Sequence, residues 1–254
     1  MKIITCCKVV PNEEEIKVLS DRTLDMSAVP FKISQYDLNA LESGKQLAAA
    51  TKGTQVALSI GSTAALEATK IRKDILSRGV DSLSVVMNDN CTFSDSLETA
   101  KSIVAALNAS EGYDVVLCGM GSSDLYFQEV GVQVGTLLDL PTVNNVTGIE
   151  VIDDNTLKVE RALENEVEVL EVTLPAVICV SSEINVPSVP AMRDIMRAGK
   201  KPVNVLDAAI EAAPSTQVLE ELAPEQQERR QEIIEGDGEE AIDALVSFLK
   251  KECL

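Results

Sequence analysis

Short apolar runs alternate with longer amphipathic segments along roughly the first 140 residues, and this alternation limits the fold more than any other feature. The runs are rich in β-branched residues and cover 3–5, 55–60, 83–87 and 115–118. Each is followed by a segment with helical spacing, roughly over 35–50, 64–77, 94–107 and 128–138. Strands that are apolar on both faces and separated by helices are typical of a parallel sheet. The sequence therefore predicts an α/β fold with an open, mainly parallel sheet and helices on both of its faces.

The pattern changes after Pro141, where residues 142–180 have the character of four successive strands. Within them, 157–162 and 167–172 flank a short polar turn as a hairpin. The alternation slips by one residue between Glu168 and Glu171, which indicates a partly solvated antiparallel ribbon with a bulge. A second hairpin is expected near the N-terminus, between 16–19 and 23–26.

The last 48 residues form a separate unit of different composition. Residues 207–254 contain 13 acidic and 4 basic side chains, and therefore carry −9 of the formal net charge of −19. The segment 239–251 places four apolar residues on one helical face: Ile242, Leu245, Val246 and Leu249. We expect a nucleotide-binding-like α/β domain over 1–206 and a C-terminal arm over 207–254 that ends in an amphipathic helix. This helix lies either against a partner or against its own domain.

Charge and composition exclude several classes of function. The chain has 22 lysines and arginines against 41 aspartates and glutamates. Such a surface repels a phosphate backbone, so we expect no nucleic-acid partner. Histidine is absent, which rules out Ser-His-Asp and Cys-His pairs and the His-containing zinc sites. We therefore expect no enzyme active site and no metal, and we expect that any chemistry comes from something the chain binds.

The cysteines and the apolar stretches bear on location. The six cysteines show no C-x-x-C spacing, and four of them lie in or directly after apolar strand-like runs. This pattern indicates reduced, packed thiols and a cytoplasmic location. The apolar run near the N-terminus is too short for a signal peptide, and no stretch approaches the roughly 20 apolar residues of a membrane span.

The only basic patch lies at 188–204, where Arg193, Arg197, Lys200 and Lys201 face a single acid, Asp194. Two prolines precede it and favour an extended or tightly turned backbone. The patch is either a solvated helix face or a docking site for an acidic surface or phosphates, because a cluster of opposite sign steers association.

The loop after the fourth apolar run has the character of a ligand site. Gly119, Gly121, Ser122 and Ser123 follow this run, and a helix is expected to start near Phe127. Ligands of open α/β sheets bind at such strand ends, and helix N-termini favour anions. The spacing is not the G-x-G-x-x-G fingerprint, because position 124 is an aspartate that opposes a phosphate. Asp124 instead caps the helix or binds a ribose hydroxyl. A weaker site of the same kind is expected at 59–62.

Several motifs extend along nearly the whole chain up to Val203. They are CKVVP at 7–11, YDLNALE at 36–42, RGVD at 78–81, the loop 119–131, LP at 140–141 and LPAV at 174–177. The motif near the end, NVP at 185–187 followed by IMRAGKKP at 195–202, is the most specific. Together they resemble the beta subunit of the electron-transfer flavoprotein family, particularly its Fix-type variants.

The resemblance implies a Rossmann-like, adenine-nucleotide-binding fold and a heterodimer with an alpha subunit that holds most of the redox-active FAD. Such a complex carries electrons between a dehydrogenase, of the acyl-CoA type here, and a quinone reductase or other acceptor. The beta subunit usually buries AMP, or a second FAD in the electron-bifurcating branch. By position, the cofactor contacts fall at Cys7, Ser34, Gln35, Tyr36, Ile60, Gly61, Gly119, Gly121, Ser122, Ser123, Asp124, Gln128, Gly131 and Val134. The partner-binding residues fall at Asn185, Pro187, Pro190, Met192, Arg193 and Arg197, with Met192 as the protruding apolar anchor.

The chain departs from the family's pattern around the expected phosphates. Ser34 stands where many members have asparagine, and Leu125, Tyr126 and Phe127 stand among the family's smaller polar loop residues. These departures leave open whether AMP, FAD or no nucleotide binds. Two other interpretations are a free-standing adenine-nucleotide sensor of universal-stress-protein type and an enzyme acting on a small molecule. The first shares the sheet but not the ribbon, the basic loop or the arm, and the second lacks a paired nucleophile and base.

Overall fold

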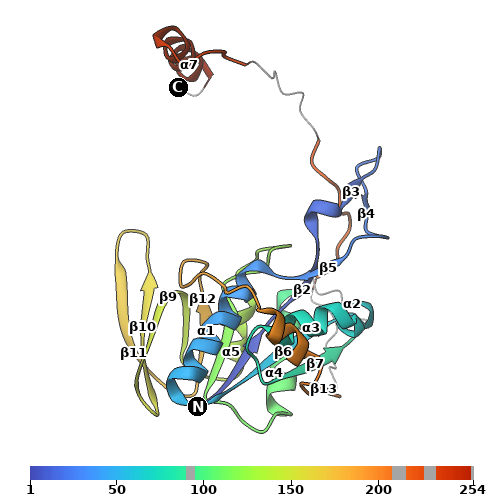
Figure 1. Cartoon of the computed structure of the whole chain (residues 1–254), viewed down its shortest axis with the longest axis vertical. Helices are drawn as coiled ribbons and strands as arrows, with labels where there is room; N and C mark the ends of the chain where they lie inside the picture. Colours follow the sequence, from blue (N-terminus) through green and yellow to red (C-terminus); the bar gives the residue numbers. More distant parts are fainter. Residues whose placement is uncertain (90–94, 208–215, 226–232, 253–254) are drawn as a thin grey trace.

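A nine-stranded sheet forms the centre of the computed structural model, which describes residues 1–89, 95–207, 216–225 and 233–252. The strands are β1 (Lys2–Cys6), β6 (Thr54–Gly61), β7 (Ser82–Met87), β8 (Val115–Gly119), β9 (Thr142–Asp153), β10 (Thr156–Ala162), β11 (Val167–Thr173), β12 (Ala176–Val180) and β13 (Val203–Val205). Their order is β11-β10-β9-β12-β8-β1-β6-β7-β13. From β9 to β13 all neighbours are parallel, whereas β10 and β11 add an antiparallel ribbon at one edge (Figure 1). The predicted open, mainly parallel sheet with an antiparallel ribbon is confirmed.

Helices cover both faces of this sheet, as predicted. Successive residues of β1 show the two faces, because side chains alternate along a strand. Ile3 packs in one buried cluster with Leu47 of α1 (Gln35–Thr51), while Ile4 packs in another with Ile103 of α4 (Ser96–Asn108). The first face also carries α2 (Thr63–Glu67), α3 (Thr69–Ser77) and α6 (Met192–Ala198), and the second carries α5 (Val130–Leu137).

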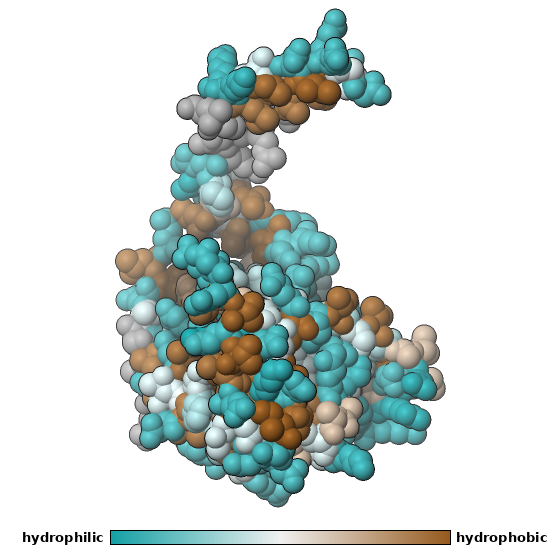
Figure 2. Space-filling model, turned by 90° about the vertical axis from the view of Figure 1, so that its left-hand side faces the viewer, coloured by the Kyte–Doolittle hydropathy of each residue, from teal (hydrophilic) through white to brown (hydrophobic). Residues whose placement is uncertain are grey.

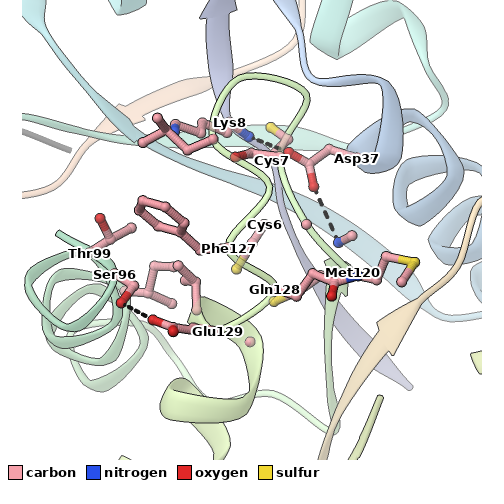
Figure 3. A pocket seen from close by; sticks show the side chains of 18 of the residues that line it. Cys6, Cys7, Lys8, Asp37, Ser96, Thr99, Met120, Phe127, Gln128 and Glu129 are labelled. Atoms are coloured by element: carbon pink, nitrogen blue, oxygen red, sulfur yellow. Dashed lines mark hydrogen bonds between the residues drawn. The ribbon is translucent and has the colours of Figure 1, made fainter. Parts of the chain in front are cut away.

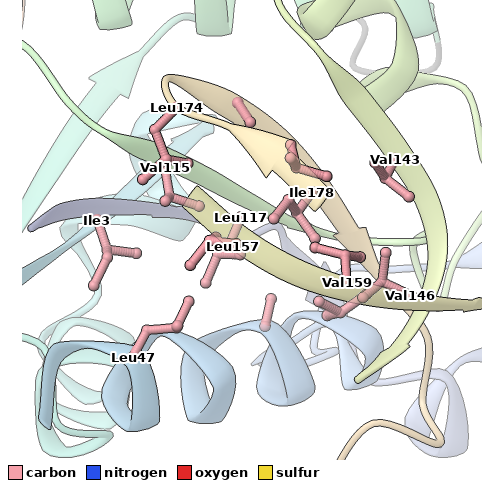
Figure 4. Packing of buried hydrophobic residues seen from close by; sticks show 14 residues of the cluster. Ile3, Leu47, Val115, Leu117, Val143, Val146, Leu157, Val159, Leu174 and Ile178 are labelled. Atoms are coloured by element: carbon pink, nitrogen blue, oxygen red, sulfur yellow. The ribbon is translucent and has the colours of Figure 1, made fainter. Parts of the chain in front are cut away.

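The antiparallel ribbon belongs to the same core as the parallel sheet. Leu157 and Val159 of β10 are fully buried in one cluster with Leu117 of β8, Ile178 of β12 and Leu47 of α1 (Figure 4). The ribbon therefore extends the sheet across α1 and is not a detached hairpin.

The predicted hairpins are confirmed, but the predicted bulge lies elsewhere. β10 and β11 pair in unbroken register from Thr156 opposite Thr173 to Ala162 opposite Val167. The register shifts occur instead between β10 and β9, at Thr156/Leu157 and at Glu160/Arg161. Near the N-terminus, β3 (Lys17–Val18) pairs with β4 (Leu24–Asp25), while β2 (Val9–Pro11) pairs with β5 (Phe31–Ile33) and a 3₁₀ turn, η1, covers Glu13–Glu15.

Three helix predictions need correction. The helix expected over 64–77 is broken at Ala68 into α2 and α3, and Arg72 Nε donates to the Leu66 carbonyl that a continuous helix would use. α4 begins at Ser96 with Asp95 as its capping residue, and Ser94 lies outside the described residues. α5 begins at Val130, three residues later than expected, because Tyr126 and Gln128 have the positive φ angles of 52° and 61° that interrupt a helix.

The described part of the arm bonds to the body at Asp95 and at Arg22, which also pairs with Glu225. Thr216 N donates to Asp95 Oδ2 over 2.9 Å, and Ala223 N donates to the Arg22 carbonyl, also over 2.9 Å. The predicted terminal helix is α7 (Glu239–Glu252), which has no buried residue. Figure 2 shows its apolar side chains gathered along one side of the helix. The described residues thus do not show α7 packed against its own domain.

Candidate functional site

A cavity lies over the carboxyl ends of β1, β6 and β8 (Figure 3). The chain passes from β1 to β6 on one side and places β8 on the other side of β1, so the cavity sits where the strand order reverses. This is the position at which open α/β sheets bind ligands. The cavity has a volume of about 110 Å³. An apolar cavity of about 150 Å³ can hold a benzene molecule, so this space is on the scale of a single planar ring.

The loop between β8 and α5 forms the rim of this cavity. Asp124 Oδ2 accepts from Lys8 Nζ over 2.5 Å, and Asp124 Oδ1 accepts from the Leu125 backbone N–H over 2.8 Å. The aspartate therefore does not cap α5, contrary to one of the two roles expected for it. The Tyr126 ring packs on Tyr36 of α1 with ring centroids 5.0 Å apart. Together these contacts hold the loop against the start of α1.

Asp37 holds the two strand ends beneath the cavity. Its buried carboxylate accepts from the backbone N–H of Lys8 over 2.7 Å and from that of Gly119 over 3.2 Å. Burial raises the pKa of Asp37 to about 7, although these hydrogen bonds and the Lys8 ammonium act in the opposite direction. One carboxyl group thus links α1 to the segments that follow β1 and β8.

The pKa of Asp37 predicts a pH-dependent stability. Because this pKa is higher in the folded chain than the ordinary 3.8, protonation stabilises the folded state at low pH, and that contribution is lost as the pH rises toward 7. We expect the stability of the natural chain, relative to Asp37→Asn, to fall by about 1 kcal/mol or more between pH 5 and 7. Urea unfolding of both chains at each pH measures this difference. The exposed Asp89→Asn is the control and should give a constant difference; parallel curves for Asp37→Asn would contradict the assignment.

Three buried thiols lie under the cavity at the ends of neighbouring strands. Cys6 and Cys118 line it, and Cys179 pairs directly opposite Cys118. The pKa values of Cys118 and Cys179 are raised well above the ordinary value. For Cys118, the hydrogen bond with Cys179 lowers the pKa, but the hydrogen bond with Cys6 and burial together raise it by more. For Cys179, the hydrogen bond with Cys118 and burial both raise the pKa. Cys7, which also lines the cavity, has a raised pKa because it is buried near Asp37. These four are the reduced, packed thiols that the sequence predicts, while Cys91 and Cys253 lie outside the described residues.

The start of α5 combines backbone donors without a cap and a nearby negative charge. Glu129 occupies its N-cap position, but its side chain makes no capping hydrogen bond and instead accepts from Ser96 Oγ over 2.5 Å. The first N–H groups of α5, whose first turn includes the cavity-lining Gly131, therefore have no side-chain cap. Lys8 is the only basic side chain among the cavity-lining residues, and it is paired with Asp124. Whether AMP, FAD or no nucleotide binds here stays a prediction.

The structure brings most of the predicted cofactor residues together. Seven line the cavity: Cys7, Ile60, Gly119, Gly121, Ser122, Gln128 and Gly131. Ser34 Oγ accepts from Ser123 N over 3.2 Å, Tyr36 packs on Tyr126, and Asp124 pairs with Lys8, so these contacts hold the rim loop in place. Gln35 and Gly61 are not among the lining residues, and Val134 is fully buried in the core beneath α5. Whether any of them binds a cofactor stays a prediction.

Other lining residues were missed by the sequence reasoning. Lys8 and Asp37 stand inside the motifs CKVVP and YDLNALE, which carried the only available signal. Ser96, Thr99 and Ile103 come from α4, where a regular amphipathic pattern gives no sign of a site.

The predicted partner-binding residues form an exposed loop that ends in α6. Val186, Val189, Met192 and Met196 have exposed fractions of 91%, 89%, 73% and 73%. The loop is nevertheless fixed to α1 at its base, because Asn185 Nδ2 donates to the Asn39 carbonyl and to Ser43 Oγ. We call residues 185–198 the apolar loop. It presents large apolar side chains on a held backbone.

The basic patch is smaller than the sequence suggests. Lys201 Nζ donates to the Leu76 and Val80 carbonyls at the end of α3, over 2.8 and 2.5 Å, and is thus directed into the structure. Arg193 and Arg197 within the apolar loop and Lys200 directly after it remain exposed, and Arg193 Nε lies 3.7 Å from Asp194 Oδ1. These three cations lie close to Met192 and Met196 in the sequence.

No described helix combines the length and the apolar character that a membrane crossing requires. Within the same described ranges, His, Cys, Asp and Glu side chains form no cluster of three or more suited to a metal ion.

The family model described as the electron transfer flavoprotein domain matches residues 21–211. The matched range includes the rim loop of the cavity and the whole apolar loop, and it leaves out β1 and α7. It covers well over half of the chain.

Proposed function

Because the chain belongs to the electron transfer flavoprotein domain family, we propose that it is the beta subunit of a heterodimeric electron-transfer flavoprotein, of the Fix type. The heterodimer carries electrons between a dehydrogenase of the acyl-CoA type and a quinone reductase or other acceptor. FAD, held mainly by the alpha subunit, supplies the electron-carrying chemistry. This chain supplies docking surfaces and has no active site of its own.

The apolar loop is the observation that carries this proposal. Exposed apolar side chains rimmed by polar or charged residues are typical of protein interaction sites. Met192 and Met196 project from α6, while Ala198 at the end of the same helix is fully buried. A redox partner must dock and leave repeatedly, and a small apolar anchor with a charged rim suits such a transient contact.

The C-terminal arm supports a second, more permanent interface. Five apolar residues of α7 are exposed: Ile242, Leu245, Val246, Phe248 and Leu249. An amphipathic helix of 14 residues is marginally stable in water unless its apolar face is covered. We assign this face to the alpha subunit.

The size of the cavity supports a flavin held mainly by the partner. A space of about 110 Å³ is much smaller than FAD, which supports placing most of the FAD outside this chain. The complete absence of histidine in the sequence also agrees with a subunit that positions a cofactor and does not transfer protons itself.

Coexpression with an alpha-type subunit tests the proposal. We expect a yellow one-to-one complex that copurifies, and mass spectrometry of the released ligands should detect FAD. A stable, colourless monomer or homodimer with bound ATP would contradict it and favour a free-standing nucleotide sensor.

Two variants of α7 make this test specific. Leu245→Asp should abolish copurification because it places a charge on the apolar face. Ser247→Asp adds the same charge on the opposite face and should leave the complex intact. Equal copurification of both variants would remove the role assigned to α7.

A further inference from the structure

We infer that α1 contains positioning residues that hold the apolar loop in its docking conformation: Asn39, Glu42, Ser43 and Lys45. This role depends on the docking function proposed above, because it concerns the same loop.

The apolar loop exposes side chains that water does not favour. Val186 and Val189 are among the most exposed apolar residues of the described chain. A loose segment of this composition would fold back onto the surface, because apolar side chains gain free energy when they leave water. Pro187 and Pro190 restrict the backbone here but do not tie it to the domain. The position of the loop therefore depends on its contacts with other elements.

A reciprocal pair of amides ties the first residue of the loop to α1. Asn39 Nδ2 donates to the Asn185 carbonyl over 2.8 Å, and Asn185 Nδ2 donates back to the Asn39 carbonyl over 3.1 Å. Asn185 Nδ2 also donates to Ser43 Oγ over 2.9 Å, while Ser43 Oγ donates to the Asn39 carbonyl over 2.9 Å. Asn39 and Ser43 are both buried. Because a buried polar group without a partner is costly, these bonds fix the main chain at Asn185.

A carboxylate and an ammonium group hold the loop again three residues later. Glu42 Oε2 accepts from Ser188 Oγ over 2.6 Å and from Ser188 N over 3.3 Å. Lys45 Nζ donates to Ser188 Oγ over 2.7 Å and pairs with Glu42 Oε1 over 3.1 Å. Partial burial acts to raise the pKa of Glu42, but the hydrogen bonds with Ser188 and Lys45 outweigh it and lower the pKa. Glu42 is therefore ionised at neutral pH, and hydrogen bonds to an ionised group are stronger than those between neutral groups.

The loop is thus held between two helices. The four α1 residues fall within two turns, and spacings of three and four positions place them on neighbouring parts of one helix face. The far end of the loop is held by α3, since Ala198 packs in one buried cluster with Ile71 and Ile75. Met192 lies on the bridge between these two supports. A loop that is already ordered loses little conformational freedom when it docks, and this raises its affinity for a partner.

Hydrogen exchange of the FAD-containing heterodimer tests the hold on the loop in the absence of a redox partner. Asn185→Ala removes the buried amide, and Ser188→Ala removes the exposed hydroxyl without disturbing the core. Each should raise the exchange rate of peptides that cover 186–198 roughly fivefold or more. Ser182→Ala alters an exposed serine just before the loop and leaves its main chain in place, so it is the matched control. Unchanged exchange in both Asn185→Ala and Ser188→Ala would overturn the role of α1.

Stopped-flow kinetics with the dehydrogenase connect this hold to docking. When the docking conformation becomes a minor population, the apparent affinity falls in proportion to that population. We therefore expect Asn185→Ala and Ser188→Ala to lower the second-order rate constant roughly fivefold, in step with the exchange data. The maximal rate at saturating dehydrogenase and the FAD content should not change. Ser188→Thr keeps the hydroxyl group and should restore the natural rate constant.

Two results would separate a failure of this role from a failure of the docking proposal. A loosened loop that reacts at the natural rate, while Met192→Ala is slow, would overturn the positioning role alone, and so would a lower maximal rate. Natural rates in Met192→Ala would instead remove the docking proposal, and the exchange measurement would still decide whether α1 holds the loop.

Discussion

Electron transfer between the heterodimer and its dehydrogenase is expected to slow tenfold or more when Met192 is replaced by alanine. Met192 is 73% exposed at the start of α6, on a backbone fixed by Ala198 and Asn185. Truncation of a central apolar anchor typically costs 2 kcal/mol or more of binding free energy, which corresponds to a factor of about 30 in affinity. Stopped-flow measurement at dehydrogenase concentrations below saturation detects this loss as a lower second-order rate constant.

Arg193→Glu tests the charged rim of the same surface. It should slow the reaction and weaken its dependence on ionic strength, because rim charges act mainly on the rate of association. The FAD content of the complex should not change in either variant, since the apolar loop lies apart from the cavity. Val205→Ala removes an exposed apolar side chain from β13 and is the matched control. Rates equal to those of the natural chain in Met192→Ala and Arg193→Glu would remove the docking role of this loop.

The unfolding free energy is expected to fall by about 3 kcal/mol when Gly131 is replaced by alanine. A methyl group at Gly131 would overlap the Cys179 sulfur and would lie 3.3 Å from Cys118 Cβ. Both cysteines are buried in strands of the central sheet and cannot move away without displacing it. Insertion of a methyl group into such a packed interior typically costs 1–3 kcal/mol. Urea unfolding followed by circular dichroism measures the change.

A second substitution distinguishes this overlap from a general effect of alanine. Cys179→Ala removes the sulfur, so the double variant Gly131→Ala/Cys179→Ala should recover at least 1 kcal/mol relative to the sum of the single changes. Gly199→Ala is the matched control, because its new methyl group would lie 3.6 Å from Lys73 Cε, an ordinary contact. It should change stability by less than about 0.5 kcal/mol. Additive single effects would show that Gly131 does not pack on the thiols.

The architecture was largely predictable from the sequence because it depends on local hydrophobic periods. The apolar runs that form β1, β6, β7 and β8 are continuous, whereas apolar and polar residues alternate along the ribbon. A few residues are therefore enough to identify each kind of strand. The break at Ala68 was not predictable, because no glycine or proline marks it and the Arg72 side chain that stabilises it lies four residues away.

The candidate site was predictable only in part. The glycine and serine residues after β8 indicate a ligand loop by their composition. Asp37, however, looks like an ordinary polar residue near the start of an amphipathic helix. Only the folded chain brings it to the backbone of Lys8 and Gly119, which are 29 and 82 positions away. The backbone conformation of Tyr126 and Gln128 could not be predicted from the sequence either, because positive φ angles are expected of glycine and not of these residues.

The position of β12 has a consequence for synthesis on the ribosome. β12 lies between β8 and β9, although it follows both in the chain. Until Val180 has emerged from the ribosome, the edges of β8 and β9 that later pair with β12 stay unpaired. Unpaired strand edges are the usual starting points of aggregation. The ribbon from β9 to β11 can form by itself as a local structure, but it joins the rest only when β12 is inserted. Completion of this fold is therefore a late, non-local event that depends on five residues near the end of the domain.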